Sequence, residues 1–319
     1  MLTLNALKIK AIISKEINRM AALACLRKME KEDVGHPQAN LQGKDRDIKK
    51  IENNFCFHTM STHPNESKRV LAIEAHPDDA EFLMAGTLTL LHQKGYKVYI
   101  ASVCTGDKGS KTLSPQEIAS KRFEEATQSA QILNGSFETL GVPDGELVFE
   151  NEIRAKVIEL VRRVDPDIII TTSPNDYMPD HEIASYLTFD ACFFASVPNY
   201  DTKQPNPAKA LNRIPNLYYA DPVELTDKFG QKVLPEFYVD ISSVIDIKEK
   251  MLSQHASQKI WLKAQHDIDD YINNMYRWSG ERGKEINVKY AEGFRQHKGH
   301  PFPKENILIQ LVPVITPKK

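Results

Sequence analysis

The sequence predicts an α/β fold, a doubly wound and mostly parallel sheet with flanking helices. From Lys68 onward, short apolar runs alternate with longer segments of helical periodicity, which is the pattern of a parallel sheet covered by helices. The chain has 319 residues and is 41% hydrophobic, enough to bury such a sheet on both faces. Polar residues follow directly after two of the apolar runs, where an open sheet of this kind binds its ligands.

Residues 1–67 precede this pattern and differ from it. A helical stripe leads into the polar stretch "KEDVGHPQANLQGKDRDIKKIENN", which has no period. We therefore divide the chain into an N-terminal helix and partly disordered linker, residues 1–67, and one domain, residues 68–319. The helix is either a partner helix or a leader that the native protein lacks, since Met60 is an alternative start. The stripe consists of Ile9, Ile12, Ile13, Ile17 and Met20.

The first half of the domain predicts strands and helices in strict alternation. The clearest boundary is "SPQE", where Ser114 can cap a helix, Pro115 occupies its first position and Glu117 completes a capping box. The expected strands are Val70–Ala75, Val98–Val103, Ser136–Leu140 and Asp167–Thr172. The expected helices are Glu81–Lys94, Ser114–Leu133 and Glu152–Val164.

The second half is less regular. The runs "NLYYA" and "PEFYVDIS" predict strands, and "NILIQLV" predicts a final strand. Two helices are expected, at about Ile245–Ser257 and Ile260–Trp278. The polar, proline-rich segment "NYDTKQPNPAKALNRIPN" predicts a long loop within the domain.

Composition excludes several classes of protein. The 41 basic and 43 acidic residues nearly balance, at a formal net charge of −2, so charge implies neither a nucleic-acid partner nor an anionic membrane. The four cysteines lack CxxC spacing, which argues against a thiolate zinc site and against a disulfide framework. No apolar stretch approaches the roughly 20 residues of a membrane span. We expect a cytoplasmic protein with no membrane span.

The segment "VLAIEAHPDDAEF" places a histidine and acids directly after the first strand. His76 and Asp79, three residues apart, can face one point and offer an imidazole nitrogen and a carboxylate oxygen to a divalent metal. A nucleotide site would need a glycine-rich turn here, and no glycine follows until Gly86. An ordinary hydrogen-bonded turn explains the same residues equally well.

A third ligand follows the fourth strand. The run "DIIITT" ends in "SPNDYMPDHEIA", which brings His181 to the same edge of the sheet. Three protein ligands with an open position for water are typical of a catalytic zinc. Spacing alone leaves the metal site and the turn as open alternatives.

Five segments resemble the LmbE-like or PIG-L family of metal-dependent N-acetylglucosamine deacetylases. They are "AHPDDAEF", "TGDKGS", "KRFEEATQSAQILNGS", "LGVPDGEL" and "PDHEIA". The resemblance runs from about Arg69 to Val197 and continues more weakly through "KEKMLSQHASQ" and "YAEGFRQH". It implies a hydrolase that removes an N-acetyl group from an amino sugar or its glycoside, uses Zn²⁺ or Fe²⁺, and self-associates.

The resemblance also implies the roles of four residues. His76, Asp79 and His181 would hold the metal, and Asp78 would be the general base. A carboxylate that binds a cation is a poor proton acceptor, so this division of labour between Asp78 and Asp79 is chemically reasonable. Asp78 also stands where a helix N-cap is expected, and a cap can face a site.

Two further residues are expected to bind substrate. Arg122 falls within the apolar stripe of its helix, so it either snorkels to solvent or points into a cleft. Its match to the "RxxExxxA" segment of the family favours the cleft. Asp107 lies in "TGDKGS", where Gly106 and Gly109 permit close backbone approach to a ligand or a tight turn.

The chain departs from the family at Met178 in "YMPDH", where many members have a second histidine. That histidine is thought to stabilise the oxyanion or protonate the leaving amine, which methionine cannot do. His255 in "HASQ" could supply the proton, and Tyr177 is a second candidate. A competing interpretation is a metal-retaining carbohydrate-binding or scaffold protein without turnover, and another is a hydrolase of a different N-acyl amide.

Overall fold

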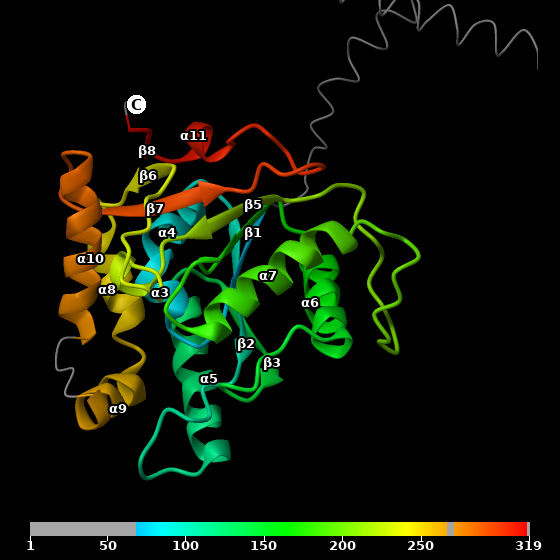
Figure 1. The fold of residues 1–319 in the computed structure, drawn as a ribbon, viewed down its shortest axis with the longest axis horizontal. Coiled ribbons are helices and arrows are strands. Elements are labelled where there is room, and N and C mark those ends of the chain that lie inside the picture. Colours follow the sequence, from blue (N-terminus) through cyan, green and yellow to red (C-terminus); the bar gives the residue numbers. More distant parts are fainter. Residues whose placement is uncertain (1–67, 267–270, 318–319) are drawn as a thin grey trace, which may run out of the picture. The chain divides into compact units, whose positions relative to one another are not determined.

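The computed structural model describes residues 68–266 and 271–317, so the predictions for residues 1–67 lie outside the described residues. The described chain forms one mixed sheet with helices on both faces (Figure 1), which confirms the predicted fold class. The strand order is β3-β2-β1-β4-β5-β7-β6-β8. In the described part of the chain, no helix is both long and apolar enough to cross a bilayer.

The first five strands are parallel. They are β1 (Arg69–Glu74), β2 (Lys97–Cys104), β3 (Ser136–Val142), β4 (Ile168–Thr171) and β5 (Asn216–Ala220). The chain moves outward from β1 through β2 to β3 and then returns to place β4 on the other side of β1. The strand order therefore reverses between β1 and β4, and a crevice for ligands is expected at their carboxyl ends.

The helices of the first half begin and end close to the predicted residues. They are α3 (Asp79–Leu83), α4 (Ala85–Gln93), α5 (Pro115–Gln131) and α6 (Asn151–Val164). A further helix, α7 (Pro179–Phe194), follows β4 and was not predicted. The capping box of α5 is present, because Ser114 Oγ accepts from the Glu117 backbone while the Glu117 carboxylate accepts from the Ser114 backbone. The single helix expected at Glu81–Lys94 is divided at Met84, whose φ of −146° is not helical.

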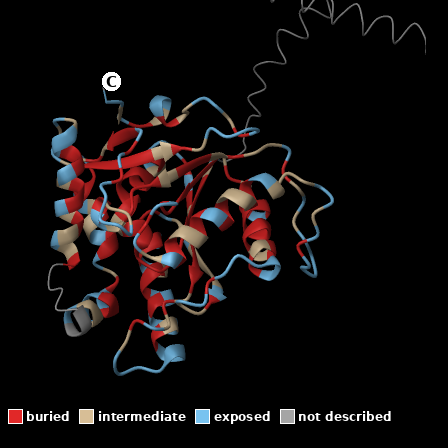
Figure 2. Ribbon diagram, in the orientation of Figure 1, coloured by how far each residue is buried: buried red, intermediate tan, exposed pale blue. Residues whose placement is uncertain are grey.

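Each strand of the parallel half sends alternate side chains to two separate cores. From β1, Val70 and Ala72 pack on the face that includes α4, and Leu71 and Ile73 pack on the face that includes α6 and α7. Figure 2 shows the buried sheet between helices whose outer faces are exposed. The sheet is covered on both sides, so its open edge at the carboxyl ends of the strands is the natural place for a site.

The second half contains β6 (Phe237–Asp240), β7 (Ala291–Gln296) and β8 (Val314–Ile315), all antiparallel to their neighbours. The prediction of a strand over "NILIQLV" is wrong, because α11 (Leu308–Leu311) lies there. The side chain of Asn306 accepts from the Leu308 backbone and so favours a helical turn. Strand β7 was not predicted, since "AEGFRQ" is poor in residues that favour strands.

Three helices cover the second half, which are α8 (Ile245–Leu252), α9 (Ala256–His266) and α10 (Tyr271–Glu285). The prediction of one helix over Ile245–Ser257 is wrong, because the chain leaves the helix after Leu252 and begins α9 at Ala256. The helix expected over Ile260–Trp278 corresponds to parts of α9 and α10. The residues between them lie outside the described part of the chain.

A buried ion pair ties β7 to the start of α4. Both oxygens of the Glu292 carboxylate accept from this helix: Oε1 from the Gly86 backbone at 2.8 Å, and Oε2 from the Thr87 backbone at 2.8 Å and its hydroxyl at 2.6 Å. The Lys248 ammonium of α8 lies 2.7 Å from Oε1. Because Glu292 and Lys248 are both buried, this pair satisfies backbone groups at a helix start that water cannot reach.

Candidate metal centre and active site

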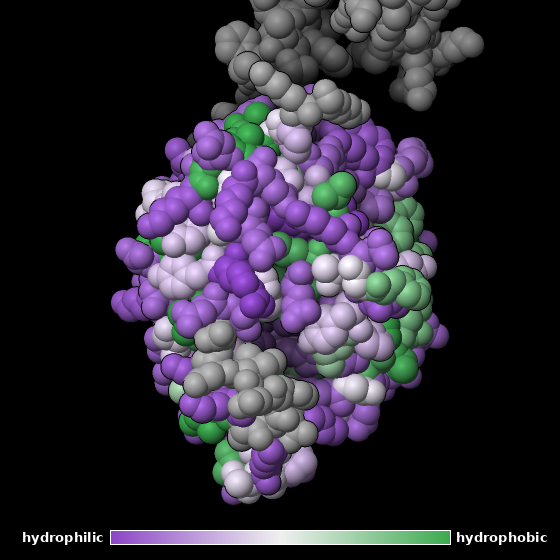
Figure 3. All heavy atoms as spheres, turned by 60° about the vertical axis from the view of Figure 1, so that its left-hand side comes forward, coloured by the Kyte–Doolittle hydropathy of each residue, from purple (hydrophilic) through white to green (hydrophobic). Residues whose placement is uncertain are grey.

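The candidate site lies at the carboxyl ends of β1 and β4, where the strand order reverses. After β1 the chain passes through His76, Asp78 and Asp79 into α3, and after β4 it reaches His181 in the first turn of α7. Two turns that are about a hundred residues apart in sequence therefore meet at one edge of the sheet (Figure 1). Hydrophilic side chains predominate on the face shown in Figure 3 and surround a hollow there.

The structure brings together the three predicted metal ligands. The His181 Nε2 atom lies 3.4 Å from Asp79 Oδ1, and the His76 Nδ1 atom lies 3.7 Å from Asp79 Oδ2. One ligand atom from each residue lies within 4.8 Å of those of the other two, and all three residues are buried. Two imidazole nitrogens and a carboxylate oxygen at this spacing fit Zn²⁺ or Fe²⁺.

A second acid supports each histidine on its other ring nitrogen. The His76 Nε2 atom lies 3.1 Å from Asp180 Oδ2, and the His181 Nδ1 atom lies 3.0 Å from Asp176 Oδ1. This carboxylate–histidine arrangement is usual for metal ligands, because it fixes the ring and leaves the opposite nitrogen for the ion. Sequence reasoning missed Asp176 and Asp180, although both stand beside His181 in the "NDYMPDHE" segment.

The charges of the cluster favour a bound cation. Burial by itself lowers the pKa of His76, but its hydrogen bonds to Asp180 and Asp79 raise that pKa well above the usual value. Burial opposes ionisation of Asp79, and the positive charge of His181 together with His76 nevertheless lowers the pKa of its carboxyl group. The buried acids attract a positive charge, which either protons on the imidazoles or a divalent ion can supply.

The segment from His76 to Asp79 forms a hydrogen-bonded turn and also belongs to the potential ligand group. The His76 backbone donates to Asp79 Oδ2 at 2.8 Å, and the Asp79 backbone donates to the His76 carbonyl at 3.3 Å. Asp79 Oδ1, the oxygen that faces His181, takes no part in this turn. The turn therefore holds the carboxylate in the orientation that a metal site requires, and the two interpretations of the segment are compatible.

Asp78 has an unusual backbone and a buried, hydrogen-bonded side chain. Its φ of 129° is rare for a residue with a Cβ atom. It occupies the N-cap position of α3, but among the described residues of that helix none donates a capping hydrogen bond to its carboxylate. Instead, Oδ1 accepts from Arg122 Nη2 at 3.2 Å and Oδ2 accepts from the Tyr271 hydroxyl at 2.6 Å. Burial raises the pKa of Asp78, against the opposing charge of Arg122.

Arg122 points into the site and does not snorkel, since it is only 2% exposed. Its guanidinium donates to the Pro77 carbonyl and to Asp78, and its Nε atom has no acceptor among the described residues. A Cβ atom on Gly106 would lie 2.6 Å from the Arg122 side chain. Gly106 therefore gives room to the arginine. Contact between Arg122 and a substrate stays a prediction.

Asp107 joins two loops beside the site. Its Oδ1 atom accepts from the Asp144 backbone at 2.8 Å, and its Oδ2 atom accepts from the Lys108 ammonium at 2.8 Å. Asp144 in turn accepts from the Gly106 backbone at 2.7 Å. These contacts support the tight-turn alternative for "TGDKGS", and a substrate contact by Asp107 stays a prediction.

His255 lies in the break between α8 and α9, where it is 1% exposed. Its Nε2 atom lies 3.3 Å from Glu81 Oε1. Burial lowers the pKa of His255, and the charge of Glu81 outweighs this effect and raises it. The start of α9 is held to α5 by Glu125, which accepts from the Ser257 backbone and hydroxyl. A role for His255 as proton donor stays a prediction.

The loop before α7 places an exposed tyrosine over a metal ligand. The ring of Tyr177, which is 54% exposed, meets the His181 ring edge-on at 5.6 Å between centroids. Burial of its hydroxyl raises the pKa of Tyr177, and the negative charge of Asp79 adds to this. Met178 follows, and its backbone donates to Asp176 Oδ1 at 3.2 Å. The second proton-donor candidate therefore lies at the site.

A second set of potential ligand atoms shares His76. His76, Cys104 and Asp144 also offer atoms within 4.8 Å of one another. Sequence reasoning missed Cys104, because it sought thiolate ligands only in CxxC spacing. Asp144 is already bonded to the backbone of Gly106 and lies 4.0 Å from Arg122, so the set with Asp79 and His181 is the better ligand group.

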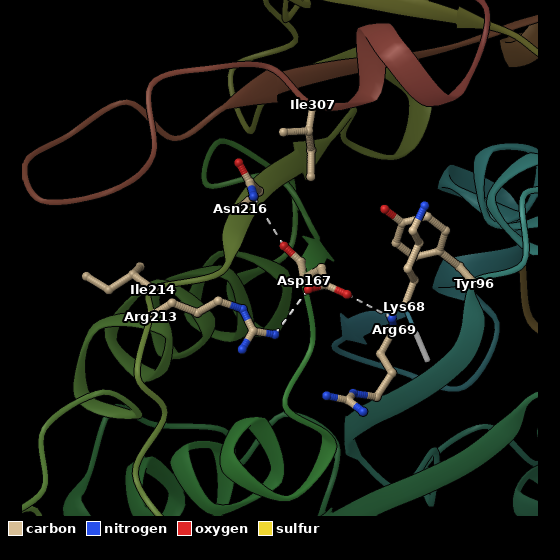
Figure 4. A pocket seen from close by; sticks show the side chains of 8 residues that line it. All are labelled: Lys68, Arg69, Tyr96, Asp167, Arg213, Ile214, Asn216 and Ile307. Atoms are coloured by element: carbon tan, nitrogen blue, oxygen red, sulfur yellow. Dashed lines mark hydrogen bonds and ion pairs between the residues drawn. The ribbon is translucent and has the colours of Figure 1, made fainter. Parts of the chain in front are cut away.

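Another cavity, of about 280 Å³, lies at the opposite edge of the sheet (Figure 4). Asp167 stands at its centre and accepts from the Arg69 backbone at 3.1 Å and from Arg213 at 3.2 Å. The Arg213 guanidinium is paired there with the Asp167 carboxylate, and the cavity is formed at the amino ends of the strands. It is therefore separate from the candidate metal centre. The lining residues are Lys68, Arg69, Tyr96, Asp167, Arg213, Ile214, Asn216 and Ile307.

Several known proteins are similar to this chain in sequence and in fold. The profile of the family described as "PIG-L: GlcNAc-PI de-N-acetylase" matches residues 71–192. The diacetylchitobiose deacetylase of Thermococcus kodakarensis is 30% identical over 244 residues, which cover 72% of this chain and 84% of that protein. The 4-oxalmesaconate hydratase of Pseudomonas putida is 23% identical over 244 residues, covering 72% of this chain and 88% of that protein.

A solved structure extends the likeness to the fold. The N,N'-diacetylchitobiose deacetylase from Pyrococcus horikoshii superimposes with a TM-score of 0.60 at 24% sequence identity, covering 85% of this chain and 98% of that one. The Thermococcus relative is matched at 30% identity over most of its length, and the family profile matches the first half of the domain. This chain therefore belongs to the PIG-L family.

Proposed function

We propose that this protein is a metal-dependent deacetylase that removes the N-acetyl group of an amino sugar or its glycoside. The observation that carries the proposal is the meeting of His76, Asp79 and His181 in one potential ligand group, with Asp78 next to Asp79 in the chain and outside that group. The 30% identity to a diacetylchitobiose deacetylase supports the same activity and a sugar substrate. Deacetylation breaks the amide bond with water and releases acetate and a free amine.

The metal would be held by His76, Asp79 and His181. A divalent ion of the zinc type would supply Lewis acidity there, which polarises an amide carbonyl and lowers the pKa of water from 15.7 toward about 7. Asp176 and Asp180 would keep the two imidazoles in the orientation that presents one nitrogen each to the ion. We propose Zn²⁺ or Fe²⁺, which accept this donor set.

Asp78 is the general base in this proposal. Its carboxylate is adjacent in the chain to the ligand Asp79 but is bonded to Arg122 and Tyr271. It therefore retains the capacity to accept a proton from the attacking water, since each oxygen has a second lone pair. A general base of this kind contributes about 10²–10⁴-fold in rate.

The leaving amine needs a proton that Met178 cannot provide. We propose His255 or Tyr177 as the donor. Replacement of His255 by Ala should lower the deacetylation rate if His255 is the donor, and Tyr177→Phe should do so if Tyr177 is. A fully active His255→Ala protein with an impaired Tyr177→Phe protein would assign the step to the exposed tyrosine, and the converse result would assign it to His255.

The direct test is acetate release from a panel of N-acetylglucosaminides, including diacetylchitobiose, with Zn²⁺ or Fe²⁺ supplied. We expect release from at least one amino sugar or glycoside and none after chelation of the metal. Full metal occupancy without release from any of them would favour the metal-retaining binding protein. Release only from acyl groups other than acetyl would favour a different N-acyl hydrolase.

A hydratase is the second candidate, because the Pseudomonas putida relative named 4-oxalmesaconate hydratase matches this chain over the same length as the deacetylase does. Both reactions need an activated water and can use the same base. The same metal-loaded preparation should therefore also be given 4-oxalmesaconate. Consumption of this compound without acetate release from any sugar would overturn the deacetylase proposal.

A further inference from the structure

A tyrosine from the far end of the chain contacts the carboxylate to which we assign the general base. Tyr271, the first residue of α10, donates its hydroxyl to Asp78 Oδ2 at 2.6 Å, across 193 positions of sequence. Tyr271 is 1% exposed and Asp78 is 7% exposed. A buried phenol needs a hydrogen-bond partner, and here the partner is the candidate base itself.

Few contacts other than the one with Tyr271 hold the carboxylate of Asp78 in place. The backbone of Asp78 is held at a φ of 129°, and strained conformations of this kind persist only where the surroundings enforce them. The side chain gains nothing from capping α3. Among the hydrogen bonds of the described residues, those from Arg122 and Tyr271 fix it, one on each oxygen.

The tyrosine ring is itself fixed. It packs edge-on against Phe82 of α3, with 4.8 Å between ring centroids at an interplanar angle of 83°. Phe82 lies four residues after Asp78 in α3, the helix whose N-cap is Asp78, so the tyrosine ring packs against the same helix that carries its hydrogen-bond acceptor. The hydroxyl therefore has a defined position relative to Asp78, which a solvent-exposed tyrosine would lack.

We propose that Tyr271 is a positioning residue that keeps the Asp78 carboxylate in the rotamer needed to accept the proton. The inference rests on the proposed deacetylation and adds α10 to its machinery. Tyr271 acts through Asp78 and touches no reacting atom. Arg122 restrains Oδ1 and Tyr271 restrains Oδ2, so loss of either contact frees the carboxylate to rotate. A misplacement of about 1 Å can cost about 10²-fold in rate.

The test is Tyr271→Phe with Tyr276→Phe as the matched control. Tyr276 lies on the same helix and donates to Glu249 Oε2 at 2.7 Å, so the control removes an equivalent tyrosine–carboxylate bond away from Asp78. We expect Tyr271→Phe to lower kcat by about 10- to 100-fold with KM and metal content unchanged. Tyr276→Phe should leave kcat unchanged. Equal kcat in both variants and in the wild type would overturn the inference.

A double variant separates positioning from a merely structural role. In an Asp78→Asn background the added Tyr271→Phe change should cause no further loss of the residual rate, because the base that it orients is absent. The same fold-loss in both backgrounds would mean that Tyr271 acts elsewhere and would overturn the inference. If Tyr271→Phe fails to fold, Phe82→Leu keeps the hydroxyl but frees the ring, and should lower kcat without changing KM. An unchanged kcat would again overturn the inference.

The two proposals fail in different ways. An active wild type with a fully active Tyr271→Phe variant removes only the positioning role and leaves the deacetylase proposal intact. A metal-loaded wild type that releases no acetate from any N-acetylated sugar overturns the proposed function, and the positioning role of Tyr271 falls with it.

Discussion

At the scale of single residues, the site separates two adjacent carboxylates that start with the same chemistry. Burial favours the protonated form of both Asp78 and Asp79, and the two imidazoles outweigh burial only for Asp79, so the pKa of Asp78 is raised while that of Asp79 is lowered. Paired titratable groups whose environments push their pKa values apart are typical of acid and base assignments. Asp79 is thus suited to hold a cation and Asp78 to exchange a proton.

The two residues should therefore respond differently to substitution. Asp79→Ala should lose the metal, because it removes one of three ligands, whereas Asp78→Asn should keep the metal and lose about 10²–10⁴-fold in turnover. Metal content by elemental analysis and acetate release, measured on the same samples, test this expectation. Equal metal loss in both variants would contradict the division of roles.

The candidate metal ligands could be predicted from the sequence because all three fall in two short motifs at the ends of apolar runs. Tyr271 could not, because no spacing or periodicity connects a residue at the start of α10 with one at the end of β1. The same holds for Glu81 as neighbour of His255, since each looks like an ordinary charged or polar residue in its own segment. Only the packing of α8, α9 and α10 against α3 and α5 brings such groups together.

At the scale of elements, the turn after β2 and the helix α5 form one unit around Arg122. The arginine crosses the turn so closely that a Cβ atom on Gly106 would lie 2.6 Å from its Cδ and Nε atoms. Asp107 and Asp144 then fix the turn by hydrogen bonds to backbone groups. Gly106 in "TGDKGS" is thus required by a side chain from another element. From the sequence alone, this reason for a glycine cannot be distinguished from the close approach of a ligand.

Gly106→Ala should lower activity by displacing Arg122 from Asp78, and Gly141→Ala is its matched control. Both glycines have positive φ, +77° and +82°, so each substitution costs about 1–2 kcal/mol of backbone strain. A Cβ atom on Gly141 meets nothing within 4 Å. We expect similar losses of Tm on this account but a fall in kcat only for Gly106→Ala. A comparable fall in kcat for Gly141→Ala would contradict the explanation.

The elements themselves were predictable where local signals agreed with the tertiary structure. The four strands and the capped helix α5 of the first half are examples, because apolar runs and caps act locally. Strand β7 escaped prediction because its Glu292 and Arg295 are stabilised by distant partners, Lys248 and Ser173. The segment at 306–312 was wrongly predicted because its apolar run suits a strand, while the Asn306 side chain favours a turn.

At the scale of the whole molecule, the candidate site is a buried cluster of acids and histidines at the carboxyl ends of β1 and β4. The described acids around the two histidines, Asp79, Asp176 and Asp180, carry more negative charge than the imidazoles can neutralise alone. Protons and metal ions therefore compete for the same place. The pKa values of His76 and His181 are raised against burial by those acids, so protons hold the metal-free site more tightly than usual.

Metal affinity should consequently rise with pH. In the metal-free protein, the raised pKa values of the two histidines stabilise the folded state at pH values below the pKa of an unfolded histidine, about 6.5. This contribution to the free energy of unfolding is lost as the pH rises through the pKa values of the folded state. Metal binds the neutral imidazoles, so the increase in Tm on adding Zn²⁺ should grow between roughly pH 6 and pH 8. Thermal melts with and without a chelator measure it.

Two substitutions on α7 provide the comparison. Asp180→Asn removes a cause of the raised His76 pKa and should flatten the pH dependence. Asp190→Asn breaks a partly buried pair between α7 and Arg154 of α6 and should leave that dependence as it is. A metal-induced shift in Tm that is independent of pH in the wild type would argue against competition by protons.

The Glu292 contact with the start of α4 has a consequence for the order in which the protein matures during synthesis. All three metal ligands and Asp78 emerge from the ribosome before residue 182, yet the backbone groups of Gly86 and Thr87 receive their acceptor 205 or more positions after they are made. Until β7 is translated, the backbone groups of Gly86 and Thr87 lack the carboxylate acceptor that they have in the complete fold. Nascent chains that stop before Glu292 should therefore be protease-sensitive around α4, so the metal is expected to be acquired late in translation or after release.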